Sequence, residues 1–176
     1  MSFVGGVSET EARGEVAAFY AELKKSWGKV PNWFLAQGSR PDIVQTEAAL
    51  FNAIFTDGAL PQKLKEQIGV VVAGINHSSY CIAIHSDVLQ RFAVPRALAR
   101  TLAVNFPEAP VSEAEMALFR FAAKLTKQPD SIQQADADEL RRHGWNDAQI
   151  LETVLAVSMM NFANRISSGL GLVVDF

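Results

Sequence analysis

Cysteine is nearly absent from the sequence, since Cys81 is the only one among 176 residues. A single cysteine cannot form a disulfide within the chain, which is typical of a reducing compartment, so we expect a cytoplasmic protein. No apolar run reaches about 18 residues, so no membrane-spanning helix is predicted. The opening MSFVGGVSET has neither a basic start nor a long apolar stretch, so no signal peptide is predicted there.

An excess of positive charge is also lacking. The formal net charge is −3, and the 16 lysines and arginines are scattered without a basic stripe, so nucleic acid is not an expected partner. Apolar residues make up 49% and charged residues 20%, which indicates a folded globular protein. The length suits one domain spanning residues 1–176.

Alternating strand patterns are missing, whereas apolar residues recur at helical spacing almost throughout. The β-branched segment GVVVAGI, residues 69–75, lies inside such a helical frame. We therefore predict an all-α, single-domain bundle of about eight helices. The first begins at a capping-box pattern, Ser8 to Glu11. The others are expected over residues 43–55, 61–75, 80–92, 95–106, 112–127, 136–143 and 146–168. Pro31 and Pro41 each suit the first turn of a new helix.

The last of these helices is apolar nearly all round, from Ile150 to Phe162. A helix with no polar face has to be covered on most sides. We expect it to be the central helix of the bundle or part of a subunit interface.

The segment INHSSYCIAIH, residues 75–85, holds the lone cysteine between two histidines. Ser78 is a good N-cap, which makes Cys81 the third residue of a new helix. The unpaired N–H groups and the helix dipole favour a thiolate there. His85 follows one turn later on the same face, whereas His77 belongs to the preceding turn.

A carboxylate can reach this histidine if the two helices fold back as a hairpin. Glu66 lies about 15 Å before the turn and His85 about 10 Å after it, at a rise of 1.5 Å per residue. The two side chains can then lie within about one helical turn of the same level. Glu66 would orient and charge His85, and His85 would take the proton of the Cys81 thiol, directly or through water.

The sequence resembles the alkylhydroperoxidase D-like family of the carboxymuconolactone decarboxylase superfamily. That family's core motif has a Glu, then Cys-x-x-Cys, then a His four residues after the second Cys. Glu66, Cys81 and His85 match it within KEQIGVVVAGINHSSYCIAIHSDVL. The flanks also look similar, and WNDAQILETVLAVSMMNFANRISSGLG resembles the C-terminal helix of the peroxidase-related branch.

The resemblance implies an all-α bundle that assembles as a trimer, hexamer or dimer and reduces hydroperoxides at the expense of a thiol. It implies that Cys81 attacks the peroxide and that His85 and Glu66 relay the proton. The family's first cysteine, which resolves the oxidised second one, is Ser78 here, so an outside thiol must restore Cys81. A family histidine between the cysteines corresponds to Tyr80, which can donate a hydrogen bond but is a poor base at neutral pH.

Other interpretations remain open. Cys81 can be an ordinary buried side chain, with Glu66 and His85 doing acid–base work on a small lactone or keto acid, so the substrate is either a peroxide or a carboxylate. The chain can also be a non-catalytic oligomer that binds a small ligand. A metal site is not expected, because His77 and His85 lie about 12 Å apart along a helix. No cofactor is predicted, and Ser78, Tyr80 and His77 are assigned supporting positions.

Overall fold

Residues 2–176 are described by a computed structural model that forms nine α-helices and two 3₁₀ turns. No strand forms among these residues, which confirms the predicted all-α fold. None of their helices is long and apolar enough to cross a membrane. The elements are α1 (Gly14–Trp27), α2 (Asn32–Gln37), α3 (Pro41–Phe55), α4 (Gln62–Ile75), α5 (Ser79–Arg91), α6 (Arg96–Asn105), η1 (Phe106–Glu108), α7 (Glu113–Lys127), η2 (Pro129–Ser131), α8 (Gln134–Arg142) and α9 (Asp147–Gly169).

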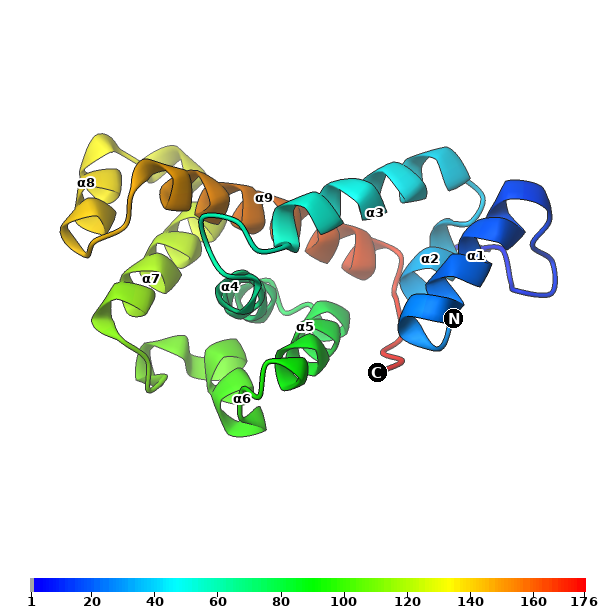
Figure 1. The fold of residues 1–176 in the computed structure, drawn as a ribbon, viewed down its shortest axis with the longest axis horizontal. Coiled ribbons are helices and arrows are strands. Elements are labelled where there is room, and N and C mark those ends of the chain that lie inside the picture. Colours follow the sequence, from blue (N-terminus) through cyan, green and yellow to red (C-terminus); the bar gives the residue numbers. More distant parts are fainter. Residues whose placement is uncertain (1) are drawn as a thin grey trace.

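Helix α4 is the centre of the bundle, and Figure 1 looks almost straight down it. It packs against α5, α6, α7 and α9, and residues 64–73 are all buried. Small residues let its neighbours come close. A side chain at Gly74 would come within 2.0 Å of the Ala103 carbonyl oxygen on α6, so only glycine fits at that crossing.

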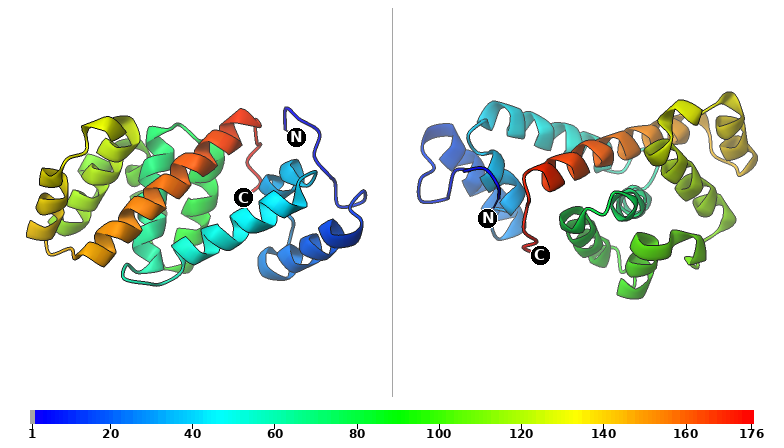
Figure 2. Two further views of the ribbon diagram at one scale, coloured as in Figure 1. Left: turned by 90° about the horizontal axis from the view of Figure 1, so that it is seen from above. Right: turned by 180° about the vertical axis from the view of Figure 1, so that it is seen from behind.

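The last helix, α9, is not the central one, because α4 has that place. The alternative, that it takes part in a subunit interface, stays a prediction. Helix α9 covers one side of α4 and buries a stripe that includes Ala156 and Met160. On its other side Leu151, Leu155 and Phe162 are 58%, 41% and 43% exposed. Helices α3 and α9 lie on the same side of the molecule, above α4 and α5 (Figures 1 and 2).

The N-terminal helices form one end of the molecule, opposite α8 (Figure 1). A small apolar cluster, separate from the main core, joins α1 to α2: Tyr20 and Leu23 of α1 belong to it, and Phe34 and Leu35 of α2 pack against it. The C-terminal tail ties this end down: the Asn32 N–H at the start of α2 donates to Asp175 Oδ2 at 2.9 Å.

The structure differs from the predicted elements at the N-terminal end. The Ser8 and Glu11 pattern does form its reciprocal hydrogen bonds, but the chain extends at Arg13 and α1 begins only at Gly14, whose φ is +53°. Glycine tolerates this left-handed conformation, so the turn ends there without strain. Helix α2 is the ninth helix. It begins directly after Pro31, where the proline indicated the first turn of a helix, in a stretch too short for its periodicity to be read.

A buried lysine holds the loop between α3 and α4. Lys65 is 2% exposed, and its Nζ donates to the Thr56 carbonyl at 2.7 Å and lies 2.9 Å from Glu152 Oε2 on α9. Glu152 also accepts the N–H groups of Ala59 and Leu60. These contacts fix the first turn of α4, where the candidate site begins.

Candidate active site

Helices α4 and α5 form a hairpin. The chain reverses at His77, whose φ is +54°, and the Ser78 N–H then donates to the Ala73 carbonyl at 2.9 Å. A left-handed non-glycine residue is uncommon and carries some strain, which the two packed helices offset. The reversal brings α4 and α5 side by side in antiparallel order.

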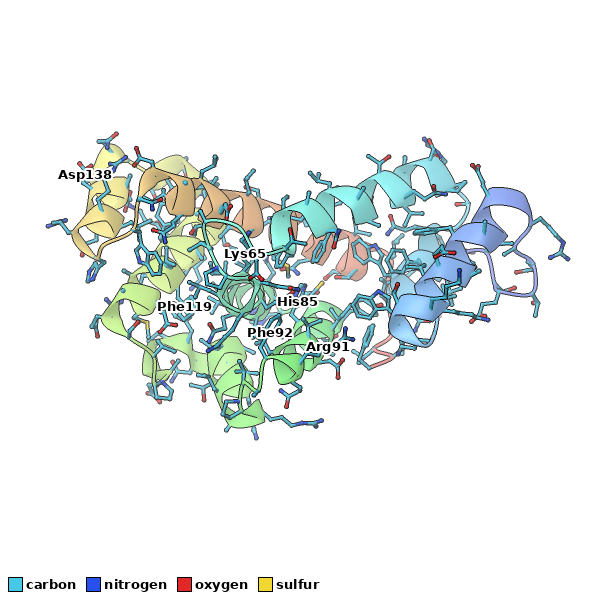
Figure 3. The ribbon with its side chains drawn as sticks, in the orientation of Figure 1. Lys65, His85, Arg91, Phe92, Phe119 and Asp138 are labelled. Atoms are coloured by element: carbon cyan, nitrogen blue, oxygen red, sulfur yellow. The ribbon has the colours of Figure 1, made fainter. Side chains whose placement is uncertain are left out.

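The hairpin brings Glu66 and His85 into direct contact. Glu66 Oε2 lies 2.5 Å from His85 Nδ1, and the two side chains are 3% and 5% exposed. Figure 3 shows His85 in the middle of the molecule, beside α4. A short carboxylate–imidazole contact out of water is a charge-assisted hydrogen bond, stronger than a neutral one.

Three neighbours fix the imidazole ring. Phe51 and Phe55 of α3 stack on each other at 4.3 Å, and their ring centroids lie 5.7 and 5.5 Å from that of His85. On the other side a Cβ at Gly69 would lie 3.4 Å from His85 Nδ1, so the backbone of α4 leaves just enough room for the ring. His85 therefore has one well-defined orientation.

The proton arrangement follows from these contacts. A carboxylate only accepts hydrogen bonds, so Nδ1 carries the proton that faces Glu66. In neutral His85 the lone pair is then on Nε2, which has no hydrogen-bond partner within residues 2–176, and His85 lines a cavity. The pair can accept a proton at Nε2 and stabilise the resulting imidazolium through Glu66.

Cys81 is the third residue of α5, as predicted, and is 2% exposed. Its Sγ lies 3.5 Å from Ser167 Oγ on α9. No hydrogen bond joins it to His85 among residues 2–176, although both side chains line the cavity. Proton transfer between them therefore requires a bridging water or a substrate atom.

Ser78 stands directly before α5, as predicted, but its hydroxyl does not cap the helix. The hydroxyl is buried and lies 2.8 Å from Ser167 Oγ. Ser167 thus touches both Cys81 and Ser78, and no sequence motif pointed to it. Its place follows from the fold, in which the buried stripe of α9 continues past Ala163 into the polar residues Asn164 and Ser167.

The cavity has a volume of about 330 Å³ and lies between the N-terminal helices and the α4–α5 hairpin. Its wall is mainly aromatic and aliphatic. The apolar lining residues include Leu23, Trp27, Trp33, Phe34, Ala48, Phe51, Phe55, Ile84, Val88, Met159 and Ala163. Arg91 lies on the side of α5 that faces α1, with its guanidinium carbon 5.1 Å from the centre of the Trp27 ring (Figure 3).

Tyr80 forms part of the cavity wall. Its phenol oxygen accepts the Trp33 N–H at 3.1 Å and so supports the start of α2. Burial strongly raises the pKa of Tyr80, and the nearby Asp175 carboxylate acts in the same direction. The phenol therefore stays protonated at neutral pH, so it remains able to donate a hydrogen bond and is a poor base.

His77 is the one predicted site residue that lies apart from the others. It is exposed in the turn and does not line the cavity, so its position gives no support to a supporting role. Within residues 2–176 no group of three or more His, Cys, Asp or Glu side chains is arranged to hold a metal ion.

The geometry defines a helical protein with a buried Glu–His pair and a cysteine facing an apolar cavity. Residues 41–124, from α3 into α7, match the model of the carboxymuconolactone decarboxylase family. This match and the similar structures described next confirm the predicted resemblance. A comparison with curated proteins gave no match.

Solved structures share the fold over nearly the whole chain. An alkylhydroperoxidase AhpD core, a peroxidase-related protein from Ralstonia eutropha JMP134, is 25% identical; the match covers 99% of this chain and 92% of that chain, with a TM-score of 0.92. A peroxidase-related protein from Silicibacter sp. TM1040 is 26% identical over 92% and 85%, with a TM-score of 0.87.

A third similar structure carries another activity in its name. It is a cysteine-to-alanine variant of the debrominase Bmp8 in complex with 2,3,4-tribromopyrrole. It is 22% identical to this chain over 99% of this chain and 92% of that one, with a TM-score of 0.82. The likeness at this identity shows the fold alone, and one fold supports several chemistries.

Proposed function

We propose that the protein is a thiol-dependent hydroperoxide reductase with a single reactive cysteine. The observation that carries the proposal is the buried Glu66–His85 pair at 2.5 Å, which opens onto the same cavity as Cys81. The match to peroxidase-related relatives supports it.

In the first step His85 Nε2 takes the proton of the Cys81 thiol through a bridging water, and Glu66 stabilises the imidazolium. The thiolate attacks the terminal oxygen of R–O–O–H. An S–O bond forms, the O–O bond breaks, and the alkoxide RO⁻ leaves. The alkoxide takes the proton back from His85, so the products are Cys81–SOH and ROH.

Regeneration needs an outside thiol, because Ser78 cannot form a disulfide and the chain has no second cysteine. One molecule of R′SH condenses with Cys81–SOH, which releases water and leaves a mixed disulfide. A second R′SH attacks this disulfide, releases the Cys81 thiol and leaves as R′SSR′.

The cavity favours an organic hydroperoxide with a compact apolar group. Its volume of about 330 Å³ and its aromatic wall suit a group of roughly the size of a substituted benzene ring. Hydrogen peroxide would leave most of that apolar surface in contact with water, so it should be the poorer substrate.

The test is consumption of cumene hydroperoxide with dithiothreitol as reductant, comparing wild type with Cys81→Ala. Ser86→Ala, another small change on α5, is the matched control. Loss of turnover in Cys81→Ala but not in Ser86→Ala supports the proposal. Equal activity of wild type and Cys81→Ala would refute it.

A second candidate is an acid–base enzyme that uses Glu66 and His85 on a small lactone or keto acid. The observation that favours it is the hydrogen-bond partner of Cys81, which is Ser167 and not His85. Turnover of such a substrate that survives Cys81→Ala would select this function. Absence of any turnover, with ligand still bound in the cavity, would point to a binding protein.

Self-association in the cytoplasm is part of the same proposal. The exposed Leu151, Leu155 and Phe162 lie along one side of α9, which suits burial against a second copy of the chain. Light scattering on the purified protein measures the assembly directly.

A further inference from the structure

Three small polar groups meet at the buried end of the site. Ser167 Oγ lies 3.5 Å from Cys81 Sγ, 2.8 Å from Ser78 Oγ and 3.0 Å from the Asn164 carbonyl oxygen. The three side chains are each 2–3% exposed. Their hydrogen atoms must therefore be distributed among themselves and this one carbonyl.

With Cys81 as a thiol, every hydrogen has a partner. Ser167 donates to the Asn164 carbonyl and accepts from Ser78 and from the Cys81 S–H. A serine hydroxyl has one hydrogen and two lone pairs, so these three contacts use it fully.

Loss of the thiol proton changes this arrangement. A thiolate only accepts, so the sulfur and the Ser167 oxygen would face each other without a hydrogen between them. A rotation of the Ser167 hydroxyl from the Asn164 carbonyl to the sulfur corrects this, and Ser78 continues to donate to Ser167. The Asn164 carbonyl keeps a partner, because in a helix it accepts the N–H of Ser168, four residues on.

We propose that Ser167 is the hydrogen-bond donor that holds the Cys81 thiolate, with Ser78 donating to Ser167 in turn. Ser78, which stands at the position of the family's resolving cysteine, thereby stabilises the Cys81 thiolate indirectly, through its hydrogen bond to Ser167 on α9. Hydrogen bonds to a charged acceptor are about twice as strong as neutral ones, so the switch favours the thiolate over the thiol.

The inference rests on the proposed function only in requiring Cys81 to react as a thiolate, and its test does not need turnover. Because Cys81 is the only thiol, alkylation by iodoacetamide reports on this residue alone. The thiolate is the reacting form, so the rate rises with pH to a plateau. In Ser167→Ala the pH of half-maximal rate should move up by about one unit relative to wild type.

Four variants make the test specific. Ser168→Ala, the exposed neighbour on α9, should leave the half-maximal pH unchanged, and Ser167→Thr, which retains a hydroxyl, should restore it. Ser78→Ala should raise it by less than Ser167→Ala. An equal pH in Ser167→Ala and Ser168→Ala overturns the inference. If Ser167→Ala fails to fold by circular dichroism, an unshifted Ser78→Ala overturns it instead.

The same measurements separate this inference from the proposed function. A shift in Ser167→Ala together with no hydroperoxide consumption by wild type supports the donor role and removes the peroxidase. Full peroxidase activity with no shift in Ser167→Ala removes the donor role and leaves the peroxidase.

Discussion

Replacement of Glu66 by glutamine removes one charge from the site with little change of shape. The Glu66–His85 contact is 2.5 Å long and the Glu66 side chain is 3% exposed, so solvent screens it little. Hydrogen bonds to charged groups are worth about 1.5–3 kcal/mol. Glutamine can still accept the Nδ1–H bond but cannot stabilise the imidazolium to that extent. Since about 1.4 kcal/mol corresponds to a factor of ten in rate, kcat/KM should fall about 10- to 100-fold.

The assay is kcat/KM for cumene hydroperoxide at saturating dithiothreitol. Glu113→Gln, the same substitution at an exposed site on α7, is the matched control and should match wild type. Thermal unfolding verifies that both variants fold. A Glu66→Gln protein within twofold of wild type would refute the role of the carboxylate.

Four further predictions concern regeneration, stability and assembly. The Ser78→Cys variant should form a disulfide with Cys81 when it is treated with an organic hydroperoxide, and mass spectrometry should show the loss of both free thiols. Persistence of both thiols would contradict this prediction. Glu152→Gln should lower the free energy of unfolding, measured in urea, by about 3 kcal/mol, because it leaves the Lys65 ammonium buried without its partner. Lys65→Met should lower it by less, because Glu152 is 24% exposed and can still be hydrated. A larger loss in Lys65→Met than in Glu152→Gln would contradict the argument. Burial raises the pKa of Glu152, but hydrogen bonds from the backbone and from Lys65 outweigh it, so the pKa lies below 4.5. The stability difference between wild type and Glu152→Gln should therefore be fully present above pH 4.5. It should shrink as the pH falls through the lowered pKa of the folded state. Leu155→Lys should dissociate the assembly in light scattering, and an unchanged mass would place the interface elsewhere.

The helices and the Glu66–His85 contact follow from information within the sequence. Amphipathic periodicity and proline or glycine boundaries determine most helix ends. The rise of 1.5 Å per residue puts Glu66 and His85 within about one turn of the same level of a hairpin, once the turn at residues 76–78 is recognised. In the structure the two side chains are in contact at 2.5 Å, as the hairpin predicted.

What could not be predicted depends on how helices rotate about their axes and on contacts distant in sequence. Ser167 faces Cys81 only because the buried stripe of α9 continues to its last turn, 86 residues along the chain. Helix α2 is held in part by Tyr80 and Asp175, neither of which is near it in sequence. The sequence left open whether α9 is central or part of an interface, because hydrophobicity alone does not distinguish a covered helix from one with an exposed apolar stripe.

The central claim, that Cys81 is the group that attacks a hydroperoxide, is tested most directly by trapping its oxidised form. Wild-type protein is treated with one equivalent of cumene hydroperoxide and then dimedone, which captures sulfenic acids, and is analysed by mass spectrometry. The account predicts one adduct per chain, on the peptide containing Cys81, with cumyl alcohol formed in equal amount. An unmodified Cys81 after the hydroperoxide has been consumed would contradict it.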